Sequence, residues 1–201
     1  MVSTLAGSAG ATGSVDGVGA NARFNNPWGV TVDASGNLFV ADVDNRAVRK
    51  ITPALVVTTL ATGFVFPISV ATDGTGNVYV ADLLDYTVRK ITPAGVVTTL
   101  AGLSGVKGST DGTGAAARFF YPSGVATDGG GNVYVADSGN DTVRKITPDG
   151  LVTTVVGQPG QYGWLPGPLP GLLATPQSVT LFGTTLYTTT YNAIVQVSNV
   201  Q

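Results

Sequence analysis

Residues 122–155 read PSGVATDGGGNVYVADSGNDTVRKITPDGLVTTV, and the same frame occurs twice more in the chain. Residues 67–100 read PISVATDGTGNVYVADLLDYTVRKITPAGVVTTL, and residues 27–60 read PWGVTVDASGNLFVADVDNRAVRKITPALVVTTL. A shorter fourth copy begins at Pro176 and reads PQSVTLFGTTLYTTTYNAIVQVSN. Self-similarity at a spacing of about 40 residues predicts a repeat architecture in which each copy forms one structural unit.

Each full copy contains four strand signals. In the copy at 122–155 they are GVATD, NVYVAD, TVRKIT and LVTTV, separated by turns rich in Gly, Asn, Asp and Pro. Val, Thr and Tyr favour strands, and Gly permits the tight turns between them. Four short antiparallel strands in a unit of about 40 residues are typical of a propeller blade. We therefore expect an all-β fold with no long helix.

The start of the chain matches the end of a repeat. Val2–Gly7 reads VSTLAG and matches VTTLAG at Val97–Gly102, whereas the copy that begins at Pro176 lacks this segment. We therefore predict a β-propeller of four-stranded antiparallel blades, four blades per chain, in which the N-terminal strand at 2–6 completes the last blade and closes the ring. The blades form a single domain, 1–201, with approximate limits 24–61, 64–102, 119–157 and 174–201 plus 2–6.

Ring closure predicts one of two oligomeric states. A strand supplied by the same chain gives a four-bladed monomer, which we favour because it avoids the entropy lost on association. A strand supplied by a second chain gives a homodimer with an eight-bladed ring. Both numbers of blades lie within the usual range of about 4–8.

The repeats resemble the NHL repeat of bacterial extracytoplasmic β-propellers. The resemblance rests on the pattern PxGVxxDxxGNxYVADxxNxxVRKITPxGVVTTLAG and covers nearly the whole chain. It implies a propeller in an extracellular or periplasmic location. NHL propellers usually have six blades and often carry a His before the third strand. This chain has Asn45-Arg46, Asp85-Tyr86 and Asn140-Asp141 near that position.

The composition excludes several classes of protein. With 43% apolar residues the chain is too hydrophobic to be disordered, and its apolar runs are too short for a membrane helix of ~20 residues. The net charge of −2 argues against a nucleic-acid partner. The first residues lack a charged segment followed by an apolar one, so we expect that any signal peptide has already been removed.

The missing residue types exclude much of catalysis. The chain has no Cys and no His, and all its acidic residues are Asp. Disulfides, thiolate nucleophiles, Ser–His–Asp triads and His-bound metals are therefore excluded. We expect no enzymatic activity and no cofactor.

A repeated Asp–Arg spacing predicts structural ion pairs. The pairs are Asp42 with Arg49, Asp82 with Arg89, and Asp137 with Arg144. Catalytic pairs are the alternative, but a single active site would need only one copy, whereas a bidentate contact could fix the geometry of every hairpin. The fourth copy has Thr190 and Gln196 in the corresponding places.

Asp residues near Gly-rich turns are a second recurring feature. Asp33, Asp73 and Asp128 precede such turns, where a carboxylate commonly accepts hydrogen bonds from the turn backbone. Asp16 and Asp111 also have Gly neighbours, but they lack the alternating acidic residues of a calcium loop. We expect no metal site at either place.

The positions where the copies differ are the candidate ligand-binding residues. In a propeller, the connections before the first strand and the turns after the second strand emerge on the same face. Function is often carried by loops that a rigid scaffold presents, and aromatic residues and Arg are common in binding hot spots. Packing between blades or plugging of the channel is the alternative for these aromatic side chains. The candidates, which we call the rim, are Trp28, Arg46, Tyr86, Tyr121, Asp141 and Tyr191.

Together these features predict a non-enzymatic binding or scaffold propeller whose aromatic-rich rim meets a protein, peptide or glycan. One alternative is a calcium-assisted lyase or hydrolase at the channel mouth, with Asp, Tyr or Arg as acid and base. A second alternative is an engineered or truncated repeat fragment with no function of its own.

Overall fold

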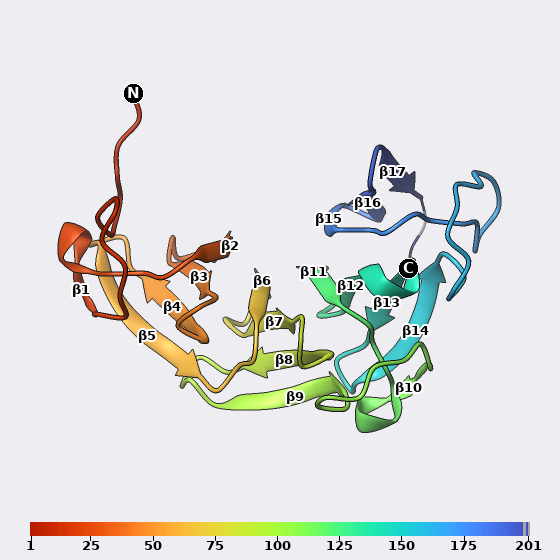
Figure 1. Ribbon diagram of the computed structural model, residues 1–201, viewed down its shortest axis with the longest axis horizontal. Helices are drawn as coiled ribbons and strands as arrows, with labels where there is room; N and C mark the ends of the chain where they lie inside the picture. The colour runs from red at the N-terminus through yellow and green to blue at the C-terminus, as the bar shows by residue number, and fades with distance from the viewer. Residues whose placement is uncertain (199, 201) are drawn as a thin grey trace.

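The computed structural model describes residues 1–198 and residue 200, and it contains four antiparallel sheets arranged side by side in an arc (Figure 1). The first sheet has the order β1-β5-β4-β3-β2, formed by Gly17–Val18, Val56–Thr62, Ala47–Ile51, Leu38–Asp42 and Pro27–Val32. The second has the order β6-β7-β8-β9, formed by Pro67–Thr72, Val78–Asp82, Thr87–Ile91 and Val97–Gly102.

The third sheet has the order β10-β14-β13-β12-β11, formed by Gly112–Thr113, Leu151–Val156, Thr142–Ile146, Val133–Asp137 and Pro122–Thr127. The fourth has the order β15-β16-β17, formed by Ser178–Phe182, Thr185–Thr189 and Ile194–Val197. Single 3-10 turns lie at Gly19–Asn21, Gly114–Ala116 and Ser138–Asn140. The prediction of an all-β fold built from repeated antiparallel sheets is therefore confirmed. We call the four sheets blades 1 to 4 in chain order.

The second strand of each full repeat is the centre of its blade. All five residues of β7 and of β12 are buried, because their side chains alternate between two neighbouring blades. The same register recurs in the three full repeats, for example Val40 opposite Arg49 and Val135 opposite Arg144. Figure 1 shows β2, β6, β11 and β15 on the concave side of the arc and β5, β9 and β14 on the convex side.

The hydrophobic cores lie between consecutive blades. One cluster joins Ala71 and Tyr79 of blade 2 to Val125 and Val135 of blade 3. Further clusters join blade 1 to blade 2 and blade 3 to blade 4. A blade therefore buries its apolar residues only when it has a neighbour on each face, which is the physical reason that such sheets are used in series.

The ring predicted from the sequence is not closed in this structure. Within the described residues the fourth blade has three strands, and residues 2–6 are neither in a strand nor paired with β17. Figure 1 shows the N-terminus and β17 at opposite ends of the arc. Because each blade turns by the angle that its own core packing sets, four blades of this sequence span an open arc. Closure within one chain is therefore corrected to an open arc of four blades.

Both ends of the arc expose residues that are buried at equivalent positions inside it. Val30 on β2 is 63% exposed, whereas its counterparts Val70 and Val125 are 6% exposed. Ile194 on β17 is 77% exposed, whereas its counterpart Val143 is fully buried. The two end faces thus have the composition of an interior interface.

The described residues contain no helix that is both long and apolar enough to cross a membrane.

Candidate functional site

The Asp–Arg pairs of blades 1 and 3 are buried anchors for the preceding loops. In blade 3, Arg144 donates from Nη1 to Asp137 Oδ2 at 2.9 Å and from Nη2 to Asp111 Oδ1 at 2.5 Å. In blade 1, Arg49 donates to Asp42 at 2.8 Å and to Asp16 at 2.7 Å. Each guanidinium also donates to two loop carbonyls, those of Val15 and Arg23 in blade 1 and those of Thr110 and Arg118 in blade 3. These carboxylates are therefore engaged within the fold.

Burial raises the pKa of Asp137 to about 6, although the Arg144 guanidinium acts to lower it. The side chains of both residues are fully buried. This pair can keep its charge only because Asn140, the Phe120 N–H and Arg144 together satisfy the carboxylate.

Blade 2 does not form the predicted pair. Asp82 accepts hydrogen bonds from the N–H groups of Val65 and Phe66, while Arg89 Nη1 lies 3.7 Å from Asp85 Oδ2. Burial raises the pKa of Asp82, and Asp85 adds to that effect. The prediction of an Asp82–Arg89 bond is therefore wrong. A loop N–H reaches the equivalent Asp in all three blades, but in blade 2 a second N–H, that of Phe66, also binds Asp82, and Arg89 lies nearest to Asp85, where the other blades have Asn.

Blade 4 requires a correction of one position. Thr188 pairs with Val195, as Val135 pairs with Arg144, so the residue equivalent to Arg144 is Val195 and not Gln196. Val195 is buried and Gln196 is exposed. By this pairing the turn of the fourth copy is two residues shorter than the others, and the sequence without the sheet register does not show where the two residues are missing.

The Asp residues of the Gly-rich turns are confirmed as structural. Asp73 accepts hydrogen bonds from the N–H groups of Thr75 and Asn77 and from both of their side chains. Burial acts to raise its pKa, but these bonds lower the pKa of Asp73 to about 2. The pKa values of Asp33 and Asp128 are also lowered, and the same turn is built around each. Within the described residues, no group of three or more acidic side chains is placed to hold a metal ion.

The connections before the first strands converge on one hollow. It has a volume of about 540 Å³ and is lined by the residue after the Pro of each copy, Trp28, Ile68, Ser123 and Gln177. Leu83, Ser138 and Thr175 add to the lining. The Trp28 ring meets Phe66 edge to face at 6.2 Å, and its Nε1 donates to Asn26 Oδ1 at 2.8 Å. Trp28 is still 56% exposed, so most of its ring surface is available.

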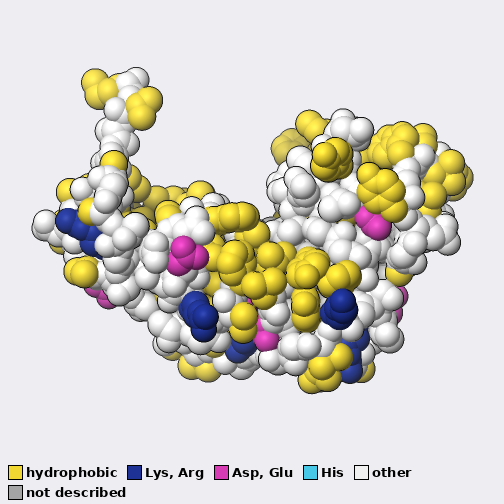
Figure 2. Space-filling model, in the orientation of Figure 1, with side chains coloured by type: hydrophobic (Ala, Val, Ile, Leu, Met, Phe, Trp, Pro, Cys, Tyr) yellow, Lys and Arg dark blue, Asp and Glu magenta, His cyan; other side chains and the backbone are white. Residues whose placement is uncertain are grey.

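A second group of aromatic side chains lies between blades 2 and 3. The rings of Tyr86 and Tyr121 are 5.6 Å apart, and Phe120 stacks on Tyr121 at 4.4 Å. The ammonium of Lys107 lies 4.5 Å from the centre of the Phe120 ring. Desolvation and the neighbouring Tyr121 hydroxyl raise the pKa of Tyr86. On the face seen in Figure 2, hydrophobic side chains gather over the middle of the arc.

The sequence analysis missed Phe66, Phe120 and Lys107. Phe66 stands one residue and Phe120 two residues before the first strand of its copy, where blade 1 has Asn26 and Asn25. The signal was therefore an aromatic residue at a connecting position. Lys107 lies in the loop before blade 3 and gave no signal, because the loop conformation alone brings it to Phe120.

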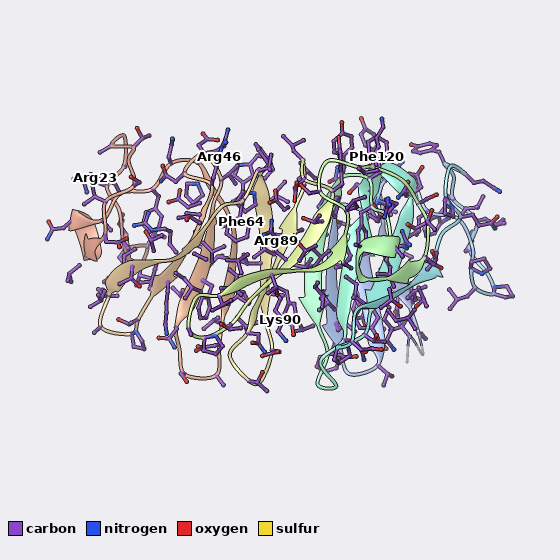
Figure 3. All side chains as sticks on the ribbon, turned by 90° about the horizontal axis from the view of Figure 1, so that it is seen from below. Arg23, Arg46, Phe64, Arg89, Lys90 and Phe120 are labelled. Carbon is purple, nitrogen blue, oxygen red and sulfur yellow. The ribbon has the colours of Figure 1, made fainter. Side chains whose placement is uncertain are left out.

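The remaining rim residues differ in their surroundings. Arg46 is exposed, and Figure 3 shows it at the same edge of the blades as Phe120. Asp141 accepts a hydrogen bond from the N–H of Thr175 at 2.7 Å, so it fixes the chain that enters blade 4. Tyr191 is 76% exposed at the end of the arc. The structure thus brings Tyr86 and Tyr121 together and places Trp28 in the hollow. It leaves ligand binding at the rim as a prediction.

Backbone strain recurs at the rim. Arg46, Tyr86 and Asp141 occupy equivalent turn positions and have φ values of 51°, 58° and 58°. A side chain in this left-handed region costs about 1 kcal/mol that Gly would avoid. A different turn, between the third and fourth strands of each blade, also contains a left-handed residue. It is Leu55 in blade 1 and Gly95 and Gly150 in blades 2 and 3. The chain therefore uses Gly at the outer turns and keeps three different side chains at the strained rim turns.

The NHL repeat model matches residues 24–51 and 119–146, so the chain contains NHL repeats. No curated protein matches the chain. Among solved structures, an auxiliary nutrient binding protein from Bacteroides ovatus has a TM-score of 0.72 and 18% identity, over 89% of this chain and 50% of that chain. One of the same description from Bacteroides thetaiotaomicron has a TM-score of 0.68 and 19% identity, over 80% and 44%.

A catalytically inactive virginiamycin B lyase from Staphylococcus aureus has a TM-score of 0.59 and 14% identity, over 86% of this chain and 55% of that chain. The chain thus spans about half the length of these three structures. At such low identity the likeness shows the shared propeller-type fold.

Proposed function

We propose that the chain is a non-enzymatic binding module that works outside the cytoplasm and uses its rim to bind a protein, peptide or glycan. The observation that carries this proposal is the strained turn position at which three blades hold Arg46, Tyr86 and Asp141 in place of Gly. Strain that an alternative residue would relieve is maintained where the side chain has a use. The adjacent hollow, which Trp28 and Ile68 line, supplies an apolar surface for the same ligand.

The names of two similar structures support a binding role. Both are described as auxiliary nutrient binding proteins, and both are bacterial. Exposed aromatic rings such as Trp28 and Tyr191 suit the flat apolar faces of sugars and of peptide side chains. Arg46, which is exposed at the rim of the blade that carries Trp28, would give a charged contact at the margin of the surface.

A lyase or hydrolase is the second candidate, and the similarity to virginiamycin B lyase keeps it open. Such an enzyme needs an acid and a base that are free to exchange protons with a substrate. The repeated carboxylates are poor candidates, because Asp42 and Asp137 are held by Arg and the turn Asp residues by backbone N–H groups. Turnover of a bound glycan or peptide by the purified chain would favour the enzyme.

The binding proposal is tested on glycan and peptide arrays with the purified chain and three variants. Trp28→Ala and Tyr86→Ala should each weaken any specific signal about tenfold or more, as for aromatic hot-spot residues. Leu151→Ala is the matched control, because Leu151 is exposed at the start of the outer strand of blade 3, away from the rim. Equal losses in all three variants, or no specific signal on any array, would count against the rim as a binding surface.

We also propose that the ring is completed by a second copy of this chain. The edge of β17 carries a groove of about 530 Å³ between residues 194–198 and the segment around Trp164 and Leu165. The sequence VSTLAG at Val2–Gly7 matches the strand that occupies the equivalent edge in blade 2. By the register of blade 3, Val2, Ser3 and Thr4 of the second copy would face Val197, Gln196 and Val195.

Light scattering tests this assembly, because the chain has a mass of 20.3 kDa and a dimer has twice that mass. Ser3→Pro removes the N–H that would face β17 in this register and should convert dimer into monomer. The N–H of the next residue faces outward, as it does at Thr59 and Thr154. Ala9→Pro, outside the strand, is the control. A particle of 20.3 kDa at every concentration would show that two copies do not close the ring.

A further inference from the structure

The edge of blade 2 differs from the edges of blades 1 and 3. In those blades a short segment from the preceding loop lies along the outer strand, with Gly17 opposite Val57 and Gly112 opposite Val152. Figure 1 shows β1 outside β5 and β10 outside β14, and no strand outside β9. The connection before blade 2 runs only from Gly63 to Phe66 and is too short to supply such a segment.

In blades 1 and 3, the short segment that lies along the outer strand is attached to the blade by one Asp carboxylate. Asp16 accepts from Arg49 Nη2 at 2.7 Å, from the Thr59 N–H at 3.1 Å and from Thr59 Oγ1 at 3.0 Å. Asp111 accepts from Arg144 Nη2 at 2.5 Å and from the Thr154 N–H and Oγ1, both at 3.1 Å. The Gly three residues further on, Gly19 or Gly114, then donates its N–H to the carbonyl of residue 55 or 150. The molecule therefore shows the same carboxylate site twice, each time filled by its own chain.

Blade 2 retains the donors of this site without the carboxylate. Arg89 pairs with Thr99 in the register in which Arg49 pairs with Thr59. The ring of Phe64 lies under the Arg89 guanidinium at 5.9 Å, as Phe24 and Phe119 do in the other blades (Figure 3). Among the residues that the structure describes, none accepts a hydrogen bond from Arg89, whose side chain is 19% exposed against 1% for Arg49.

We propose that the edge of β9, with Arg89 and Thr99, binds an extended segment of a partner protein that carries an Asp followed by Gly. The Asp carboxylate would accept from Arg89 Nη2 and from the N–H and Oγ1 of Thr99. The next residues would pair with Val97 and Val96, in the way that β1 and β10 pair with their outer strands. Addition of a strand to an open edge supplies affinity through main-chain hydrogen bonds, and the charged side chain supplies selectivity.

Asp85 sets the strength of this site. It stands where blades 1 and 3 have Asn45 and Asn140, and its carboxylate lies 3.7 Å from Arg89. It is held there by Ser104 Oγ at 2.5 Å and Thr87 Oγ1 at 2.9 Å. Its negative charge competes with an incoming carboxylate, so Asp85→Asn should tighten binding and recreate the arrangement of the other blades.

The probe is the capped peptide GSVDGVGA, the sequence of residues 13–20, compared with the same peptide carrying Asn in place of Asp. Titration into isotopically labelled full chain, followed by the amide signals of Val97 and Thr99, gives the affinity. We expect the Asp peptide to bind about tenfold more tightly than the Asn peptide, as for one charge-assisted contact. We also expect Asp85→Asn to tighten binding several-fold.

Arg89→Gln and Thr99→Val should weaken binding of the Asp peptide, whereas Lys90→Gln is the matched control that removes a charge from the same strand. Circular dichroism checks that each variant is folded. Equal affinity for the two peptides, or no shift at Val97 and Thr99 in both the native chain and Asp85→Asn, would overturn the proposal. The result is separate from rim binding, because it uses a different edge of the molecule.

Discussion

Blades 1 and 3 are each preceded by a long loop that blade 2 lacks, and this loop changes the role of an equivalent Arg. Where the loop is present, as before blade 3, Arg144 has four hydrogen bonds and no exposed side-chain surface. Where the loop is absent, Arg89 is partly exposed and its nearest carboxylate is Asp85 at 3.7 Å. The same strand sequence, VRKIT, is therefore an interior anchor in one blade and an open surface in the next.

The largest expected difference in unfolding free energy is between the variants Arg144→Ala and Arg89→Ala. Arg144→Ala leaves the Asp137 carboxylate buried without its partner and should cost about 3–5 kcal/mol of unfolding free energy. Arg89→Ala should cost about 1 kcal/mol, since Asp82 keeps its bonds from Val65 and Phe66. Urea unfolding of both variants measures the difference. Equal losses would mean that the loop contacts do not distinguish the blades.

A second comparison sets the end of the arc against its interior. Val125→Ala should destabilise by about 2 kcal/mol, because Val125 is buried between blades 2 and 3. Val30→Ala at the equivalent exposed position should change stability by less than about 0.5 kcal/mol. Thermal unfolding at low protein concentration tests both. A large loss for Val30→Ala that grows with concentration would instead indicate that this face is covered in an assembly.

The strained turns offer a comparison between rim and outer edge. Leu55→Gly should stabilise the chain by about 1 kcal/mol, because it relieves a φ of 61° at a position where blades 2 and 3 already have Gly. Tyr86→Gly should be close to neutral in stability, since relief of strain is offset by loss of the contact with Tyr121. Loss of ligand binding without loss of stability in Tyr86→Gly would separate the rim from the scaffold.

The smallest expected effect is the acid dependence that the Gly-rich turns impose. The pKa of Asp73 is about 2 in the folded chain, whereas a free Asp side chain has a pKa of 3.8. Its contribution to the free energy of unfolding is therefore complete above pH 4 and is lost as the pH falls toward 2. The loss for Asp73 should be below about 1 kcal/mol, because its carboxylate is only partly buried and solvent screens it. Asp33 and Asp128, whose pKa values are also lowered, act in the same direction. Unfolding between pH 2 and 5 measures it, and an Asp→Asn variant at all three turns should flatten the curve.

Much of the fold could be predicted because each repeat carries local sequence features that define its strands and turns. These local features are the alternating apolar residues of NVYVAD, the Gly-rich turns after Asp, and the Asp–Arg spacing of seven residues. In all three full copies the second and third strands pair in the same register. The predicted bond between Asp82 and Arg89 does not form, and the cause is local as well. The four-residue connection before blade 2 was visible, but its effect on Asp82 depends on where two backbone N–H groups point.

The candidate site was less predictable than the fold. Tyr86 and Tyr121 come from different blades, so their contact depends on the angle between two sheets rather than on any spacing in the chain. Phe120 and Lys107 joined them for the same reason. Sequence patterns could select variable positions near one face, but they could not select which of those side chains would touch.

The strands, the turns and the division into blades follow from the amino-acid sequence alone, because hairpin register and hydrophobic alternation act over a few residues. Three features depend on how the blades pack together: the open arc, the separation of residues 2–6 from β17, and the edge without a covering strand beside Arg89. These outcomes depend on the packing angle accumulated over three interfaces between blades. No short stretch of sequence encodes that angle, since it is set by side chains that meet from opposite ends of the repeat.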